Sequence, residues 1–434
     1  MKKNLFKTAS LGIQHVLAMY AGAVIVPLIV GGAIGLTGQE LTYLVAIDLL
    51  MCGIATILQV WKNKFFGIGL PVMLGCTFTA VGPMIAIGGD YGVSAIYGSI
   101  LVGGVFVVLI STIFGKLIKY FPPVVTGSVV TIIGITLIPV AMNDMAGGQG
   151  SADFGSLQNL ALSFGTLIFI LVLYRLAKGF IRQIAILLGL IGGTVVAYFV
   201  GRVNFSAVSE ASWFHMPTPF YFGMPTFEIS AIITMILVLI VGLVEASGVY
   251  FALSDITGKK LSEKDLAHGY RAEGVATIFG AIFNAFPYTT YSQNVGLVQL
   301  SGVKKNSVVY AAGAFLILLG FIPKISAFTT VIPTPVLGGA MLAMFGMVIS
   351  AGIKMLSKVD FSSQENQLII ACSVGMGLGI TTVPSLFQNL PDGIQILSSN
   401  GIVIGSLTAI FMNLIFMKKS ATRQVQIVEE PKAS

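Results

Sequence analysis

Charged residues are scarce in this 434-residue chain and make up only 9% of it. Soluble globular domains carry roughly 25% charged residues, so a soluble protein is excluded. Hydrophobic residues amount to 56% and the mean hydropathy is +0.93, which indicates a polytopic membrane protein with the lipid bilayer as its surroundings. The net charge of +7 comes from basic residues scattered over short loops rather than gathered in a patch, which excludes a nucleic-acid partner.

Residues that bind metals or attack substrates are also few. Cys52, Cys76 and Cys372 lie in apolar segments far apart in the sequence, which favours small core residues over disulfides or metal ligands. The loop residues His215 and His268 have no partner at ligand spacing. The sequence contains no metal cluster, catalytic triad or phosphate loop. We therefore predict that the chain is not an enzyme and uses no metal or cofactor.

Long apolar runs dominate the chain. Windows that can cross, or nearly cross, about 30 Å of hydrocarbon number fourteen, and the third and tenth are interrupted by Gly and Pro. The first window is long enough to span, so we interpret it as a helix and not as a signal peptide. The windows are 9–30, 41–60, 67–87, 94–114, 122–142, 158–178, 183–201, 228–252, 271–284, 285–300, 306–323, 329–353, 366–382 and 400–417.

The positive-inside rule orients these spans. With a cytoplasmic N-terminus, 22 of the 24 basic residues fall on the inside and only Arg202 and Lys324 fall outside. A wrong span count would scramble this alternation, so we predict a multi-pass protein of the plasma membrane with both termini in the cytoplasm. Beyond the last span we predict only a short tail, 418–434.

The two halves of the chain echo each other. Pro123-Val124 and Gly127 match Pro335-Val336 and Gly339 at an offset of 212 residues, and the segment from Leu70 to Phe78 matches 286–294 at an offset of 216. Two halves of seven spans each must have opposite topology. We therefore predict two inverted seven-segment repeats, with the substrate site near the midplane where the broken segments of spans 3 and 10 meet.

The tenth window carries most of the polar side chains expected at membrane depth. Ser292, Gln293 and Asn294 follow one another, and irregular backbone at that depth is tolerated only inside protein or beside a wet cavity. The amides of Gln293 and Asn294 both donate and accept hydrogen bonds, as a planar nucleobase requires. The alternative is that they join helices to each other, as polar residues do in membranes.

Three ionisable residues within spans are candidates for binding or proton transfer. Glu245 lies well inside the eighth span, where a carboxylate costs at least about 2.5–3.5 kcal/mol and indicates a functional site; a structural role is the alternative. His15 could relay protons or orient a neighbour. Glu273 begins the ninth span, near the cytoplasmic edge, where a solvated carboxylate needs no special role. Asp48 lies nearer the extracellular end, and we expect it to reach the surface.

The string Gln293-Asn294-Val295-Gly296, followed by Ser301-Gly302, resembles the signature of the nucleobase–ascorbate transporter family. Gln14-His15, the string ending at Phe78, and Glu245 within Val-Glu-Ala-Ser-Gly resemble further marks of that family. The resemblance covers essentially the whole chain in order. It is greatest to bacterial xanthine permeases, across 249–257 and 270–274.

The resemblance implies an all-α fold with a core domain and a gate domain, and homodimers joined through the gate domains. The core would comprise 1–120 and 228–324, and the gate 121–227 and 325–417. The resemblance also implies that Glu245 bonds the base, that Gln293 faces its other edge, and that backbone N–H groups near Phe78 and Ser292 complete the site. It makes Glu273 a residue needed for transport. Asn294 completes the substrate-binding set that we predict.

Two positions depart from the family pattern. Ser301 stands where Thr is commoner, and Val249 replaces a polar residue, so that proton coupling through Val249 is unavailable and Glu245, His15 and Glu273 are the candidates. We predict a proton-coupled permease that imports a purine, with xanthine favoured. The rivals are permeases for uric acid, another purine or uracil, and, from another class, an anion channel or exchanger of the same fold.

Overall fold

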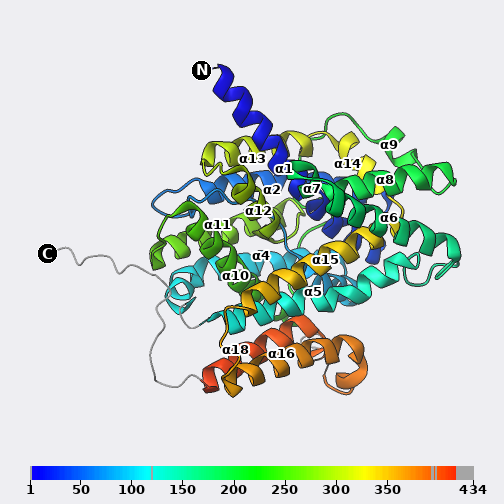
Figure 1. Ribbon diagram of the computed structural model, residues 1–434. Helices are drawn as coiled ribbons and strands as arrows, with labels where there is room; N and C mark the ends of the chain where they lie inside the picture. Colours follow the sequence, from blue (N-terminus) through cyan, green and yellow to red (C-terminus); the bar gives the residue numbers. More distant parts are fainter. Residues whose placement is uncertain (1, 119–120, 392–394, 396–397, 417–434) are drawn as a thin grey trace.

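The computed structural model describes residues 2–118, 121–391, 395 and 398–416, so the predicted tail lies outside the described residues. Helices make up nearly all of the described regular structure, which confirms the predicted all-α fold (Figure 1). The first half contains α1 (Lys2–Ala33), α2 (Gly38–Val60), β1 (Leu74–Cys76), the 3-10 turn η1 (Phe78–Ala80), α3 (Val81–Tyr91), α4 (Val93–Leu117), α5 (Pro123–Met145), α6 (Leu157–Leu176), α7 (Gly179–Gln183) and α8 (Ala185–Phe199).

The second half repeats this order after a short connecting helix. Its elements are α9 (Ser206–Glu210), α10 (Ile229–Thr257), α11 (Glu263–Ile282), β2 (Tyr288–Thr290), α12 (Ser292–Ser301), α13 (Asn306–Gly320), α14 (Pro323–Thr330), α15 (Thr334–Leu356), α16 (Gln364–Thr382), the 3-10 turn η3 (Pro384–Phe387) and α18 (Gly401–Phe416).

Each of the fourteen predicted windows overlaps a helix. Among the described residues, seven helices are individually long and apolar enough to cross a membrane, and α13 with α14 forms an eighth such unit that is bent by 81°. The third and tenth windows are broken as predicted, because each contains a strand followed by a short helix. The other windows correspond to shorter or more polar helices.

Local sequence signals explain where several helices begin. Thr37 and Glu40 form a capping box at the start of α2, and Ser262 and Asp265 form another at the start of α11. The second box places the start of α11 eight residues before the predicted window. Pro123 opens α5 and Pro335 lies in the first turn of α15, where a missing N–H is harmless. The repeated Pro-Val string therefore marks the start of two equivalent helices.

Glycines bring equivalent helix pairs into close contact in the two halves. A Cβ on Gly53 of α2 would lie 2.5 Å from the carbonyl oxygen of Gly313 on α13, and one on Gly104 of α4 would lie 3.1 Å from that of Gly274 on α11. Spans 2 and 11 therefore cross as spans 9 and 4 do, which is the relation that an inverted repeat produces. Such small-residue crossings are common between membrane helices.

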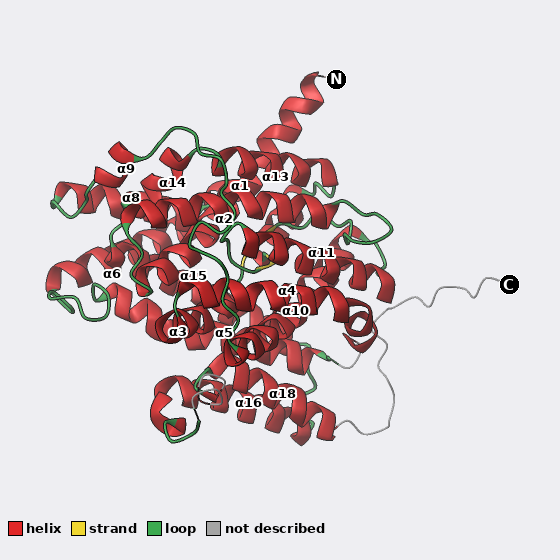
Figure 2. Cartoon of the chain, turned by 180° about the vertical axis from the view of Figure 1, so that it is seen from behind, coloured by secondary structure: helices red, strands yellow, loops and turns green. Residues whose placement is uncertain are grey.

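The helices form two packed groups. The first consists of α1, α2, α4, α10, α11 and α13, while α5, α6, α8, α15, α16 and α18 form the second. Both views place α16 and α18 as an outer layer beyond α5 (Figures 1 and 2). The helix α14 packs on α2 and so on the first group, although the predicted boundary between core and gate, at 324/325, falls within it.

Candidate substrate site at the broken segments

The two broken segments meet as a two-stranded antiparallel sheet. Leu74 pairs with Thr290, Gly75 with Thr289 and Cys76 with Tyr288. Leu74 and Thr290 are 216 residues apart, which is the offset of the sequence repeat, so this pair joins equivalent residues of the two halves. The pairing therefore lies on the internal two-fold relation, where an inverted repeat places a transporter's binding site.

Each strand leads directly into a helical turn. The turn η1 begins at Phe78 and α12 begins at Ser292, and the rings of Phe78 and Tyr291 stack with centroids 6.3 Å apart. The first N–H groups of a helix have no intrahelical partner and carry partial positive charge. The structure thus places two helix starts next to each other, at the two positions where the family resemblance implies backbone donors for a base.

Tyr291 is fixed between the strand and the first helix, and sequence reasoning missed it. Its hydroxyl donates to the carbonyl oxygen of Cys76 at 2.9 Å. A Cβ on Gly75 would lie 2.4 Å from its ring, and one on Gly22 of α1 would lie 2.9 Å from it. The signal that could have identified Tyr291 is Gly75 in the strand β1, because a glycine within a strand indicates the close approach of another group.

Glu245 is brought to the same place by α10, which contacts η1, β2 and α12. The hydroxyl of Thr79 in η1 donates to its Oε2 atom at 3.1 Å. The predicted acid is therefore attached to the turn that follows β1, one residue beyond Phe78. Thr79 is a second residue that sequence reasoning missed.

Ser292 and Gln293 line a cavity of about 170 Å³. On one side its walls come from α1 of the first helix group and from α12, which packs on α1. On the other they come from α6, α8 and α15 of the second group and from α7, which packs on α6 and α8; Gln183, Tyr174 and Met344 are among the lining residues. The cavity is thus located between the two groups of helices. Glu245 is not among its lining residues, so the structure places the acid and the amide on adjoining elements rather than in one described cavity.

Asn294 and His15 are bonded to each other. The amide nitrogen of Asn294 lies 3.1 Å from Nδ1 of His15 and donates to its carbonyl oxygen at 3.0 Å. Both side chains are buried, and neither lines the cavity that contains Gln293. This geometry corresponds to the helix-joining alternative for Asn294 and the orienting alternative for His15.

Glu273 lies in a buried network, and the interpretation of it as a solvated residue at the membrane edge is wrong. The capping box starts α11 ten residues before Glu273, so this residue lies well inside the helix and not at its end. Its side chain is 3% exposed. Its Oε1 atom accepts a hydrogen bond from Tyr250 of α10, whose hydroxyl also accepts one from Gln59 of α2. Glu245 lies near enough to Glu273 to interact with it through space.

Asp48 is also buried, contrary to the expectation that it reaches the surface. It is fully buried on α2, and its Oδ1 atom accepts the backbone N–H of Phe286 at 2.8 Å. That bond attaches the start of the second broken segment to α2. Such backbone N–H groups need a partner at membrane depth, and Asp48 provides it.

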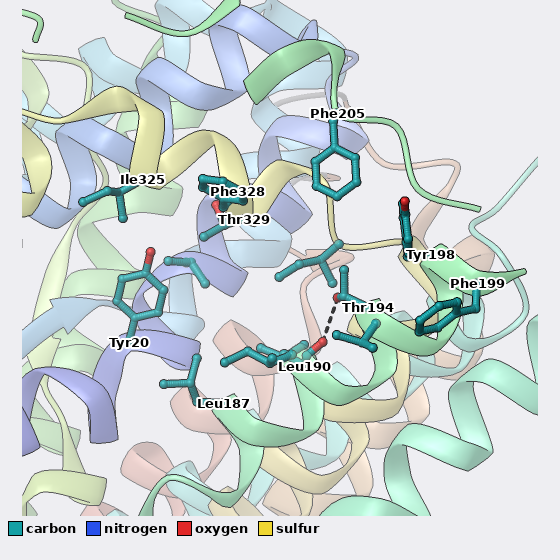
Figure 3. Close-up of a pocket in the computed structure, with 14 residues that line it drawn as sticks. Tyr20, Leu187, Leu190, Thr194, Tyr198, Phe199, Phe205, Ile325, Phe328 and Thr329 are labelled. Carbon is teal, nitrogen blue, oxygen red and sulfur yellow. Dashed lines mark hydrogen bonds between the residues drawn. The ribbon is translucent and has the colours of Figure 1, made fainter. Parts of the chain in front are cut away.

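A larger cavity of about 590 Å³ lies farther along α1 and α8 (Figure 3). Its walls are nearly all apolar, and Thr194 and Thr329 use their hydroxyls on carbonyl oxygens of their own helices. Leu187 lines both cavities. Those two hydroxyls have no hydrogen left to donate to the carbonyl groups of a base, and most of the wall is apolar, so size does not identify the site.

Comparisons with known proteins agree with this architecture. Residues 6–386 match the model of a permease family. The chain is 63% identical over 426 residues to a xanthine permease of Bacillus subtilis (strain 168), covering 98% of this chain and 97% of that protein. It is 64% identical over 416 residues to the uric acid permease PucK of the same strain, covering 96% and 97%.

A solved structure shares the fold. The transmembrane domain of the cyanobacterium bicarbonate transporter BicA aligns with a TM-score of 0.65 at 16% sequence identity, covering 92% of this chain and 98% of that one. At that identity the likeness shows the fold alone, and it confirms the predicted class of architecture.

Proposed function

Because the chain belongs to the nucleobase–ascorbate transporter family, we propose that it is a proton-coupled symporter that imports a purine base, with xanthine the favoured substrate. The observation that carries the proposal is the antiparallel pairing of β1 with β2, which sets the Thr79–Glu245 bond beside the start of α12. The high identity to a xanthine permease and to a uric acid permease supports a purine substrate.

The chemistry of the paired segments suits a flat ring edged with carbonyl and N–H groups. Gln293 offers both a donor and an acceptor. The N–H of Thr79 in η1 is already bonded to the hydroxyl of Thr77, so the backbone N–H groups of Phe78 and Ser292 would bind carbonyl oxygens of the base. Glu245, when protonated, donates one further hydrogen bond, and when ionised it accepts one from the base. The base would thus be held by groups from both repeats.

The cavity at Gln293 indicates how the base would move. Its walls come from helices that we assign to a core domain (1–120 and 228–324) and to a gate domain (121–227 and 325–417). Sliding of the core against the gate would carry Glu245 and the base together, and release of the proton would follow on the cytoplasmic side. We further infer a homodimer joined through the gate domains, in the plasma membrane, with both termini in the cytoplasm.

Uptake of labelled xanthine into vesicles, with and without an imposed pH gradient, tests this proposal. We expect accumulation only with an inward proton gradient, and its loss when an ionophore collapses that gradient. Competition by uric acid, hypoxanthine, guanine and uracil identifies the preferred base, and stronger competition by uric acid would replace xanthine as substrate. Voltage-dependent anion currents without base-dependent proton flux would contradict the proposal and favour an anion channel or exchanger.

A further inference from the structure

A small cavity of about 10 Å³ lies between α10, α11 and the strand pair, apart from the cavity at Gln293. Glu273 and Thr277 of α11 line it, together with Thr77 and Thr289 of the two broken segments. The remaining walls are mostly apolar. With Tyr288, which also lines it, five residues with side-chain oxygens thus surround a space at membrane depth that the proposed transport cycle does not yet use.

Thr289 brings an unpaired hydroxyl to this space. It is 3% exposed, and its hydroxyl oxygen has no hydrogen-bond partner among the described residues. In the strand pair it stands opposite Gly75, which has no side chain to offer it a partner. An unpaired buried hydroxyl is destabilising, and such groups in native proteins are usually satisfied by an ordered water or ion.

We propose that a single water molecule fills this cavity and hydrogen-bonds Glu273 and Thr289, which makes Thr289 a positioning residue for Glu273. The volume is close to the 10–15 Å³ or so that one water needs, and a buried water requires about two to four polar partners. Glu273, Thr289, Thr277 and Thr77 provide them. This inference rests on the proposed proton-coupled transport, because it assigns the water a part in holding the proton at Glu273.

The water links the charge of Glu273 to the broken segments. An ionised Glu273 accepts a hydrogen from the water, whereas a protonated Glu273 donates one to it. Each change turns the water, and with it the hydroxyl of Thr289, three residues before the start of α12 at Ser292. Protonation of a residue on α11 is thereby transmitted to the helix start that would bind the base.

Other groups that face Glu273 come from every element packed against α11. From α10 these are Tyr250, which donates to it, and Glu245, which acts through space. Tyr270 lies on the same helix, and Tyr288 of β2 lines the same cavity. The helix α2 contributes Gln59 through Tyr250, and α4 contributes only the apolar Val107 to the cavity wall. None of these groups forms a hydrogen bond with the hydroxyl of Thr289. The water is therefore the group through which Thr289 acts on Glu273.

Thr289→Val tests the proposal, because valine keeps the shape of threonine and removes its hydroxyl. A hydrogen bond to a carboxylate favours its charged form, so its loss leaves Glu273 protonated to higher pH. We expect the pH of half-maximal uptake to rise by about one unit. We also expect a high-resolution structure of the wild type to show water density beside Glu273, and that of the variant to lack it. Thr289→Ser, which keeps the hydroxyl, should retain the wild-type profile and the water. Thr277→Val, on the opposite wall, should move the profile in the same direction.

Three results from the structure and the variants would overturn the inference, and a fourth would come from ion dependence. The first three are a wild-type structure without water density at Glu273, an unchanged pH profile in both valine variants, and an equal shift in Thr289→Ser. Base uptake that requires Na⁺ in place of a pH gradient would also overturn it, by assigning the cavity to a cation. Failure of the proposed function can be told apart from failure of this inference. If the wild-type chain takes up no base, the proposed function fails, and the structure still tests whether the water is present.

Discussion

The two broken segments share a backbone path and differ in their side chains. Each forms a three-residue strand followed by a helical turn, and the strands pair at equivalent residues. The first strand is Leu-Gly-Cys, whereas the second is Tyr-Thr-Thr and continues into Ser292, Gln293 and Asn294. The first segment therefore provides space and a helix start, while the second provides hydrogen-bonding side chains.

The same contrast extends to the helices that hold these segments. The glycine crossings of α2 with α13 and of α4 with α11 are equivalent in the two halves. In contrast, Glu245 lies on α10, and its counterpart in the first half, α1, contains no carboxylate and carries His15 instead. The repeat thus fixes where backbones meet, and departures from the repeat determine the chemistry. A site that is symmetric in side chains would accept a base in two orientations.

Replacing Glu245 by Gln should have the largest effect on this contrast, because it removes the carboxylate that bonds Thr79 beside the paired strands. We expect uptake against a gradient to vanish and base affinity to fall about 10- to 100-fold, since hydrogen bonds to charged groups contribute about 1.5–3 kcal/mol. The measurement is proton-driven uptake together with equilibrium binding. Glu228→Gln, at the exposed start of the same helix, is the control and should leave both unchanged. Unaltered proton-driven uptake in Glu245→Gln would contradict the assignment.

Adding a methyl group to the first segment tests whether space is its contribution. In Gly75→Ala the new Cβ would lie 2.4 Å from the ring of Tyr291, and that ring cannot swing away without losing the bond to Cys76. We expect a loss of stability of about 1–3 kcal/mol, typical of an overpacked core, and a matching loss of uptake. Thermal unfolding in detergent and base uptake measure the two effects.

The matched control for Gly75→Ala is Gly89→Ala on α3, where a Cβ would meet no atom within 4 Å. It should be neutral or slightly stabilising, since alanine favours a helix. Equal stability of the two variants would show that Tyr291 does not depend on the space at Gly75.

The sequence predicts much of the difference between the two broken segments, but it does not predict the contacts that hold them in place. Apolar windows and repeated Pro-Val and Gly strings predict the spans, the two broken segments and their meeting. The sequence could not reveal that Asp48 holds Phe286 or that Tyr250 bonds Glu273, because these contacts join residues 238 and 23 positions apart through the fold. Polarity alone likewise fails to separate Gln293 from Asn294. On one helix, adjacent residues point in different directions, and only the fold shows which direction leads to the cavity.

Gln293→Ala should weaken base recognition without loosening the fold. The side chain lines the cavity, and losing about one hydrogen bond to the base would reduce affinity about 10-fold, or ~1.4 kcal/mol. Thermal stability should stay within about 0.5 kcal/mol of the wild type, as expected away from packed contacts. Competition assays with several bases measure the first effect. A destabilised protein with unchanged base preference would assign Gln293 to helix packing.

Asn294→Ala should give the opposite result, with the smallest effect on base recognition, because this amide bonds His15 and does not face the cavity. We expect stability to fall by about 1–2 kcal/mol, since the truncation leaves a buried histidine without its partner, and base preference to remain unchanged. Thermal unfolding and the same competition assay separate the two. His15→Ala should cause a similar loss, and the double variant should lose less than the sum, because contacting residues share one interaction. If Asn294→Ala instead changed base preference at unaltered stability, both amides would serve the substrate, and the division of labour between neighbouring residues of α12 would be wrong.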